Sequence, residues 1–281
     1  MHEKIFVNAD VNQKSRQPFH DSKTFTKTLY FLTGNYRVRE NLSVYAQYAT
    51  GFLLPDISVT QAVNPNLKDL NPQTSTNYQA GFVYHGGRIT ADADVYEVDF
   101  KNKLQTVSVI DPVLGATTAS FNLGGATYKG VEGQVSFAAT DNLVLFANGS
   151  INSAKALGAN TTILGVPVVV AGGKQIAGAP KSTAAVGVLW NDEHWSASLT
   201  DKYTGEAWAA EGEPAAYKIA SYNSSDLTLV YRIDRFRIEG AVYNLFDSQK
   251  FTTIKAGKTA AYDQYYFQVG RNYQVSLKVN F

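Results

Sequence analysis

Apolar and polar residues alternate one by one along many short stretches of the chain. At its end, residues 273–281 alternate Tyr, Val, Leu, Val and Phe with Gln, Ser, Lys and Asn. A period of two puts successive side chains on opposite faces of a β-strand. The same alternation recurs upstream in 5–11, 30–36, 42–48, 78–84, 89–95, 131–137, 143–147, 186–190, 195–199, 227–231 and 236–242. The pattern predicts about twelve strands, many of them near the roughly 9 to 11 residues that a tilted strand needs to cross a bilayer.

The connections between these stretches fall into two length classes that alternate along the chain. The short connections are rich in turn-forming polar residues and cover 39–41, 85–88, 140–142, 191–194 and 234–235. The long ones cover 13–25, 53–74, 103–127, 155–180, 205–220 and 246–267 and are expected to be irregular. Outer-membrane barrels sort their connections in this way, with tight turns in the periplasm and long loops outside. The sequence therefore predicts an all-β, antiparallel, up-and-down transmembrane barrel with both chain ends in the periplasm.

A soluble β-sandwich or barrel also alternates along its strands and stays open as an alternative. Its core would need large apolar side chains at native packing density. The apolar face here carries many small residues, which are tolerable against lipid. They are Ala91, Ala93, Gly133, Ala147, Gly149, Ala197, Gly240 and Ala241.

Composition narrows the class further. Aromatic residues make up 12% of the 281 residues, a bias typical of strands and interfaces. The absence of cysteine excludes a disulfide framework, a thiolate metal site and a cysteine nucleophile. A net charge of +1 without basic runs argues against nucleic-acid binding. No stretch reaches the roughly 18 to 20 apolar residues of a transmembrane helix, and residues 1–10 lack the basic and apolar regions of a signal peptide.

No residue pattern predicts catalysis, and we expect neither a metal site nor a cofactor. The four histidines are scattered without the spacing of a metal site. Asp92 and Asp94 share one strand face. We interpret them as carboxylates that face the barrel lumen rather than as a catalytic pair.

The three tryptophans indicate two further features. Trp190 and Trp195 flank a tight turn, as aromatic residues of an interfacial girdle do. Trp208 lies in a long outer loop with Tyr203 and Tyr217 nearby, and the three are candidate ligand-contacting aromatics. The alternative role of Trp208 is packing of the loop on itself.

Near the end of the chain, Asn244-Leu245-Phe246-Asp247 follows a predicted strand. This tetrapeptide resembles the signature found before the last strand of TonB-dependent outer-membrane receptors. The final Phe281, after Tyr273, Leu277 and Val279, resembles the C-terminal signal that the barrel assembly machinery recognises. Segments 42–52, 70–81, 122–124, 130–133 and 179–181 also resemble the family's barrel, although the family usually has Glu at the position of Gln73 and often at that of Gln79. Within the family, the chain is most similar to siderophore receptors.

This resemblance implies that residues 1–281 form the C-terminal half of a barrel of about 22 strands. The signal peptide, the TonB-binding box and the plug domain of complete members are expected to be missing from the chain. The implied function is TonB-dependent uptake of a scarce small-molecule ligand, such as a ferric siderophore, across the outer membrane of a Gram-negative bacterium. The implied partners are outer-membrane lipid, the barrel assembly machinery and, through the missing plug, the TonB complex.

Two other functions stay open at this point. An even number of strands with both ends in the periplasm could close into a passive small pore or an adhesin-like barrel. A soluble β-rich binding module is the other alternative.

Overall fold

One large antiparallel sheet dominates the chain. The computed structural model describes residues 2–9, 19–54, 71–111, 115–122, 124–163, 166–210, 212–255 and 260–279. Eleven strands form the main sheet, in the order β21-β18-β17-β14-β13-β10-β9-β6-β5-β4-β3. Their bounds are β3 (Phe31–Arg39), β4 (Leu42–Leu53), β5 (Gln73–Gly86), β6 (Ile89–Lys101), β9 (Gly125–Ala138), β10 (Leu143–Leu157), β13 (Ser182–Asn191), β14 (Trp195–Thr204), β17 (Tyr222–Ile233), β18 (Phe236–Tyr243) and β21 (Asn272–Val279).

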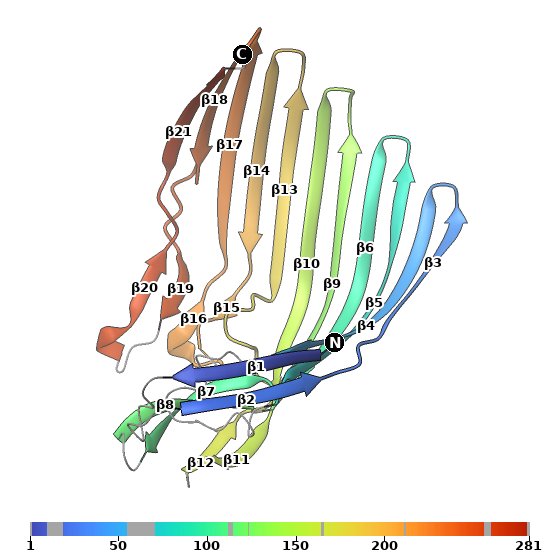
Figure 1. Cartoon of the computed structure of the whole chain (residues 1–281). Coiled ribbons are helices and arrows are strands. Elements are labelled where there is room, and N and C mark those ends of the chain that lie inside the picture. Colours follow the sequence, from blue (N-terminus) through green and yellow to red (C-terminus); the bar gives the residue numbers. More distant parts are fainter. Residues whose placement is uncertain are drawn as a thin grey trace.

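The main sheet curves into an open trough, and its two edge strands, β3 and β21, lie apart (Figure 1). The five predicted tight turns are confirmed, and all of them lie at one end of the sheet, the tight-turn end. In the turn between β5 and β6, Gly87 has a φ of 55°, a left-handed conformation that favours glycine. The longer connections lie at the opposite end, the loop end.

The long connections carry strands of their own, so the expectation that they are irregular is wrong for their described parts. Each of four connections contains a two-stranded sheet, which pairs backbone groups that a bare loop would leave to solvent. These are β7 (Leu104–Asp111) with β8 (Gly115–Asn122), β11 (Ala159–Ile163) with β12 (Val166–Val170), β15 (Ala207–Trp208) with β16 (Lys218–Ile219), and β19 (Phe251–Lys255) with β20 (Gln264–Phe267). Two short 3-10 helices, η3 (Ala215–Tyr217) and η4 (Ala260–Tyr262), lie in the same connections.

The N-terminal segment differs from the prediction. Alternation in 5–11 predicts a barrel strand, but β1 (His2–Ala9) pairs with β2 (Phe19–Thr26) in a separate two-stranded sheet, and residues 10 and 11 lie outside the described part. This hairpin lies at the loop end, so the predicted periplasmic position of the chain's start is wrong (Figure 1). A period of two indicates a strand but does not say which strand it pairs with. The main sheet therefore has eleven strands instead of about twelve.

The odd strand count fixes the directions of the two edges. Neighbouring strands of the main sheet are antiparallel throughout, so the first and the eleventh run the same way. β3 leads into the tight turn at Glu40, and the end of β21 pairs with the start of β18, next to the tight turn at Asp234. Both edges therefore run from the loop end to the tight-turn end.

The register of the strands divides the main sheet into an apolar and a polar face. On the outward face, Val131 and Ile151 are directly paired and are 53% and 74% exposed. The next pair, Glu132 with Ser150, lies on the concave face. Ala241 is the exception among the small residues predicted on the apolar face, because it pairs with Gln274 and lies on the concave side. Apolar outside and polar inside is the arrangement of a membrane barrel rather than of a soluble one.

The outward apolar band has limits along the strands. On β6, outward positions from Ile89 to Val95 are apolar, and the next, Glu97, ion-pairs with Lys129 at 2.8 Å. Eight residues of strand span about 27 Å, which a tilt of about 40° reduces to roughly 20 Å, close to the apolar band of about 25 Å in outer-membrane barrels. No helix within the described residues is long and apolar enough to span a membrane.

Candidate functional site

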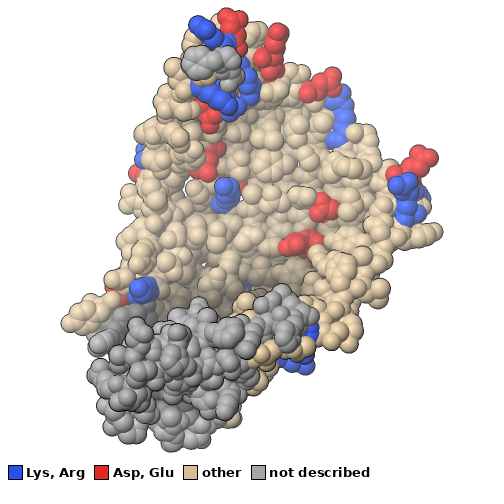
Figure 2. Space-filling view, viewed as in Figure 1, with Lys and Arg blue, Asp and Glu red and all other residues tan. Residues whose placement is uncertain are grey.

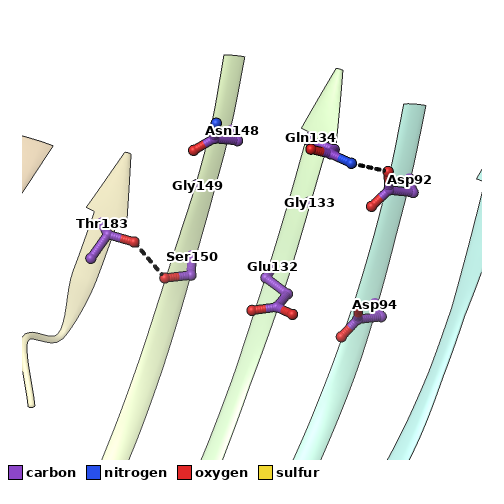
Figure 3. Close-up of a pocket in the computed structure, with 9 residues that line it drawn as sticks. All are labelled: Asp92, Asp94, Glu132, Gly133, Gln134, Asn148, Gly149, Ser150 and Thr183. Atoms are coloured by element: carbon purple, nitrogen blue, oxygen red, sulfur yellow. Dashed lines mark hydrogen bonds between the residues drawn. The ribbon is translucent and has the colours of Figure 1, made fainter. Parts of the chain in front are cut away.

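A row of polar side chains crosses four neighbouring strands on the concave face. Register places Asp94 of β6 beside Glu132 of β9, Glu132 beside Ser150 of β10, and Ser150 beside Thr183 of β13. The hydroxyls of Ser150 and Thr183 lie 2.9 Å apart. Figure 3 shows the four side chains extending from successive strands. A single row of the sheet thus brings together residues that are far apart in the sequence.

A second row, one step closer to the tight-turn end, adds another carboxylate. Gln134 of β9 donates its amide N–H to Oδ1 of Asp92 at 2.6 Å (Figure 3). Asn148 of β10 is paired with Gln134 and faces the same side. Together the two rows line a cavity of about 320 Å³. Figure 2 shows acidic side chains in the hollow of the sheet.

Asp94 is held by a hydrogen bond from β4, which lies two strands away in the sheet. The Tyr45 hydroxyl donates to Oδ2 of Asp94 at 3.1 Å. Between them lies Gly81, where a Cβ would stand 2.9 Å from the Tyr45 oxygen, so a side chain there would disturb this hydrogen bond. Within the described residues, the other oxygen, Oδ1, is buried and has no donor. The site therefore has spare acceptor capacity.

The chemistry of this site is that of binding. Asp92, Asp94 and Glu132 have no ion-pairing cation among the described residues. No group of three or more potential metal ligands occurs in the described part of the chain. Carboxylates, amides and hydroxyls can accept hydrogen bonds from a polar or cationic group that enters the trough. The interpretation of Asp92 and Asp94 as carboxylates on one inward face agrees with their positions.

The sequence did not indicate the other members of the site. Glu132, Gln134, Ser150 and Thr183 stand in ordinary alternating strands and have no motif. Only the pairing of β6 with β9, of β9 with β10 and of β10 with β13 brings them into one site with Asp94. The available signal was polarity at every second position, which assigns these side chains to the polar face of the sheet but does not identify their neighbours on adjacent strands.

Trp208, a candidate ligand-contacting residue, lies in a packed block of loops. It is only 8% exposed. The ammonium groups of Lys181 and Lys218 lie 4.7 and 5.6 Å from its ring centroid, in the range of cation–π contacts. Both lysines also ion-pair with Glu206, at 2.5 and 2.7 Å. These contacts favour packing of the loop on itself.

The electrostatics of this block keep Glu206 ionised. The hydrogen bond from Lys181, and after it the one from Lys218, lowers the pKa of Glu206 to about 2. Glu213, in the same connection as Glu206, accepts from the backbone N–H of Gln175 in the connection after β10 at 2.7 Å and thereby has its pKa lowered. Ionic contacts thus join the connection after β10 to the connection after β14.

The other two candidate aromatics lie in different surroundings. Tyr217 is close to Trp208, because the backbone N–H of Ala209 donates to the Tyr217 carbonyl at 2.8 Å. Its hydroxyl donates to Asp263 at 3.3 Å, which raises the pKa of Tyr217. Tyr203, on β14, pairs with Ala184 and lies on the outward face. The structure therefore brings Trp208 and Tyr217 together and leaves Tyr203 apart.

Trp190 and Trp195 lie where a girdle would require. Both are on the outward face beside the tight turn between β13 and β14 and are 38% and 45% exposed. The Trp195 ring centroid is 4.5 Å from that of Tyr231 on the next strand. An interfacial role for the two tryptophans remains a prediction.

The tetrapeptide that resembles a family signature forms a hydrogen-bonded turn at the loop end. Asn244 is 4% exposed and has a φ of 51°. Its side-chain amide donates to the carbonyls of Ser248 and Val269, and its amide oxygen accepts from the Ser248 N–H, each at 2.9 Å. Asp247 accepts from the Arg271 N–H at 2.8 Å. The motif therefore ties the exit of β18 to the entry of β21. The Leu245 backbone N–H donates to the Ser225 carbonyl at 2.7 Å, and the Phe246 side chain is 77% exposed.

The predicted assembly signal is only partly described. Tyr273 and Leu277 lie on the outward face of β21 and are 71% and 64% exposed. Val279 ends the strand opposite Phe236. Phe281 lies outside the described residues. Recognition of these residues by the assembly machinery remains a prediction.

Comparison with known proteins bears on the whole sheet. The family model for the TonB-dependent receptor-like β-barrel matches residues 6–245. Among solved structures, the ferric yersiniabactin uptake receptor FyuA from Yersinia pestis is similar, with 18% identity and a TM-score of 0.70 over 95% of this chain and 40% of that one. The siderophore receptor PiuA from Acinetobacter baumannii is 16% identical, with a TM-score of 0.73 over 94% of this chain and 37% of that one. The copper transporter OprC is 18% identical, with a TM-score of 0.73 over 95% of this chain and 41% of that one. At these identities the likeness shows the fold, and this chain spans about two fifths of each of those chains.

Proposed function

The chain belongs to the TonB-dependent receptor-like β-barrel family, and on this premise we propose that it is the C-terminal part of an outer-membrane receptor barrel for a scarce ligand of the ferric siderophore class. Members of this family are outer-membrane transporters, not enzymes. The proposal for this chain is that its loop end and concave face bind the ligand. Its further partners are outer-membrane lipid, the barrel assembly machinery, and a plug through which the TonB complex acts.

The observation that carries this proposal is the division of the main sheet into two faces. Outward side chains such as Val131, Val186 and Leu229 are 53%, 53% and 45% exposed, which suits contact with lipid. The concave face holds Asp92, Asp94 and their polar neighbours in a shallow cavity. A soluble binding module would bury the first set, and a passive pore would need a closed sheet.

The ligand class rests on similar proteins and on the chemistry of the loop end. Similar solved structures are named as uptake receptors for ferric yersiniabactin and ferric catecholate and as a ferric citrate transporter. At the loop end, Lys181 and Lys218 share a single carboxylate, that of Glu206, so this group keeps a net positive charge. A net positive charge suits an anionic ferric complex.

Tryptophan fluorescence can locate the ligand, because the three tryptophans lie at opposite ends of the molecule. Trp190→Phe with Trp195→Phe leaves Trp208 as the only tryptophan, at the loop end, whereas Trp208→Phe leaves the other two. In detergent, ferric enterobactin is expected to quench the Trp208 reporter with a midpoint on the order of micromolar. The Trp208→Phe protein is the control and should keep its fluorescence. Equal quenching of both proteins, or of neither, would contradict ligand binding at the loop end.

The membrane part of the proposal predicts that a charge is costly on only one face. Arg at Val188, Leu229 or Leu277 should lower the free energy of unfolding in lipid by about 2 to 4 kcal/mol, with the larger values nearest the bilayer midplane. Arg at Gln274 or Ser276 on the concave side should change it by less than about 0.5 kcal/mol. Urea titration of protein refolded in lipid vesicles measures both. Equal costs on the two faces would indicate a soluble core.

A further inference from the structure

A row of three cations crosses the last three strands at the tight-turn end of the concave face. Arg232 of β17 is paired directly with Arg237 of β18, and Arg237 is paired directly with Lys278 of β21. Like charges directly opposite each other on neighbouring strands are destabilising. Figure 2 shows Lys and Arg side chains gathered at this end of the sheet. A negatively charged partner would therefore stabilise the row by relieving this repulsion.

The described residues neutralise only part of this charge. Glu239 ion-pairs with Arg237 at 2.8 Å. Arg232 donates to the Ser196 hydroxyl at 2.7 Å, which uses a donor but brings no negative charge. Among the described residues, no other carboxylate ion-pairs with the three cations. The row keeps a formal charge of about +2 at neutral pH.

The facing of the row argues against membrane lipid as its partner. At the same level of the strands, the outward positions are Phe236, Ile238 and Leu277, which are 38%, 45% and 64% exposed. These apolar side chains are the ones that lipid would meet. The three cations lie on the opposite side, at the tight-turn mouth of the trough.

The spacing of the row suits an extended acidic peptide. Neighbouring strands are about 4.8 Å apart, so three cations in a row cover roughly 10 Å. In an extended chain, carboxylates two residues apart are separated by about 7 Å on one side. A segment with acidic residues at alternate positions can therefore reach both ends of the row, whereas a single small anion reaches only neighbouring cations. Arginine also forms bidentate hydrogen bonds with carboxylates.

From the directly paired cations Arg232, Arg237 and Lys278, with Glu239 as their only carboxylate partner among the described residues, we propose that this row binds an acidic polypeptide segment. The segment enters the concave face through its tight-turn mouth. Its carboxylates stand at alternate positions of an extended chain. The row is thus an interaction surface separate from the carboxylate site around Asp94.

The test uses the whole chain refolded in uncharged detergent and a fluorescent peptide, Glu-Gly-Glu-Gly-Glu. Fluorescence anisotropy should show binding that weakens as salt rises, because the contact is ionic. Arg232→Gln with Lys278→Gln should weaken it at least about tenfold, since about 1.4 kcal/mol already changes affinity tenfold and two charged contacts are lost. The matched control, Arg39→Gln with Arg88→Gln, removes the same charge at the same end of the sheet and should change affinity less than about twofold.

Further measurements keep the proposal falsifiable if the double variant folds poorly. Lys278→Glu should raise the urea midpoint at low salt, because it replaces a repulsive contact with an attractive one; a lowered midpoint would overturn the repulsion argument. Equal peptide binding by the two double variants, or binding of Lys-Gly-Lys-Gly-Lys as tight as that of the acidic peptide, would overturn the proposal. So would release of the peptide by phosphatidylglycerol in the micelle, which would identify lipid as the partner.

Discussion

Refolded alone in detergent, the chain is expected to remain an open sheet that self-associates and not to close into a monomeric barrel. The two free edges, β3 and β21, run in the same direction, as required by eleven antiparallel strands. Closing the sheet on itself would therefore need one parallel seam in an otherwise antiparallel barrel. Parallel pairs are slightly less stable, and closure at eleven strands would also change strand tilt and shear together.

Leaving the edges open is costly in a different way. β3 has nine residues and β21 has eight, and each presents backbone groups without a partner along one side. Such groups cost several kcal/mol each in hydrocarbon. The expected outcome is pairing between copies through their free edges, which makes detergent-soluble oligomers of open sheets instead of a sealed pore. Strands that complete the barrel with antiparallel pairing at both edges must be odd in number.

Cysteine crosslinking separates the open sheet from a closed barrel. Tyr36→Cys with Leu277→Cys places one thiol on each edge, on outward positions near the tight-turn end. The pair should form disulfides between copies and not within one chain, because a disulfide needs Cα atoms within about 7 Å. Val44→Cys with Phe82→Cys, at directly paired positions, is the positive control for an internal disulfide. An internal disulfide from the edge pair, together with heat-modifiable monomer on a gel, would contradict the open sheet.

All eleven strands of the main sheet and the five tight turns could be predicted from the sequence, because both leave local signals in it. Period-two alternation in β5 and β6, for example, needs only neighbours in the sequence, and the turn at Gly87 needs only its own residues. The same signal wrongly assigned residues 5–11 to a barrel strand, since their described part, residues 5–9, lies in the β1–β2 hairpin, which alternates as well as a barrel strand does. Strand pairing is a long-range property, so alternation cannot count the strands of one sheet.

The candidate site was predictable only where one strand contains it. Asp92 and Asp94 share β6, and their common face follows from spacing. Glu132 and Thr183 join them through the register of β9, β10 and β13, which no local pattern reports. The burial of Trp208 by Lys181 and Lys218 depends on how separate loops fold together. The position of Trp208 in the sequence indicated which loop it belongs to, but not how exposed its side chain is.

The signature tetrapeptide shows a third case, in which a motif was found but its role needed the structure. Asn244 stands at a left-handed φ of 51°, which Asn tolerates better than most residues. Its side chain satisfies two carbonyls and one N–H of the segments before and after the β19–β20 hairpin. Its own N–H donates to Asp226 at 3.0 Å. The motif therefore joins the segments before and after the β19–β20 hairpin.

Asn244→Ala is expected to destabilise the protein by about 2 to 4 kcal/mol. The change removes the side-chain partner of three backbone groups, the N–H and carbonyl of Ser248 and the carbonyl of Val269, and each lost hydrogen bond costs about 0.5 to 1.5 kcal/mol because water replaces part of it. Alanine also tolerates a positive φ less well than asparagine does, which adds up to about 1 kcal/mol. Asn244→Gly relieves the strain but does not restore the hydrogen bonds, so its free energy of unfolding should lie between those of the unmodified protein and Asn244→Ala. Urea unfolding in detergent measures the order of stabilities, and hydrogen exchange should show β21 opening first, because Asn244 ties its entry to β18.

Asn272→Ala is the control, since Asn272 is exposed and its side chain makes one local hydrogen bond to Gly270. This change should cost less than about 0.5 kcal/mol. If both alanine variants lost the same stability, or if β21 exchanged no faster in Asn244→Ala, the tie between β18 and β21 would not depend on this side chain.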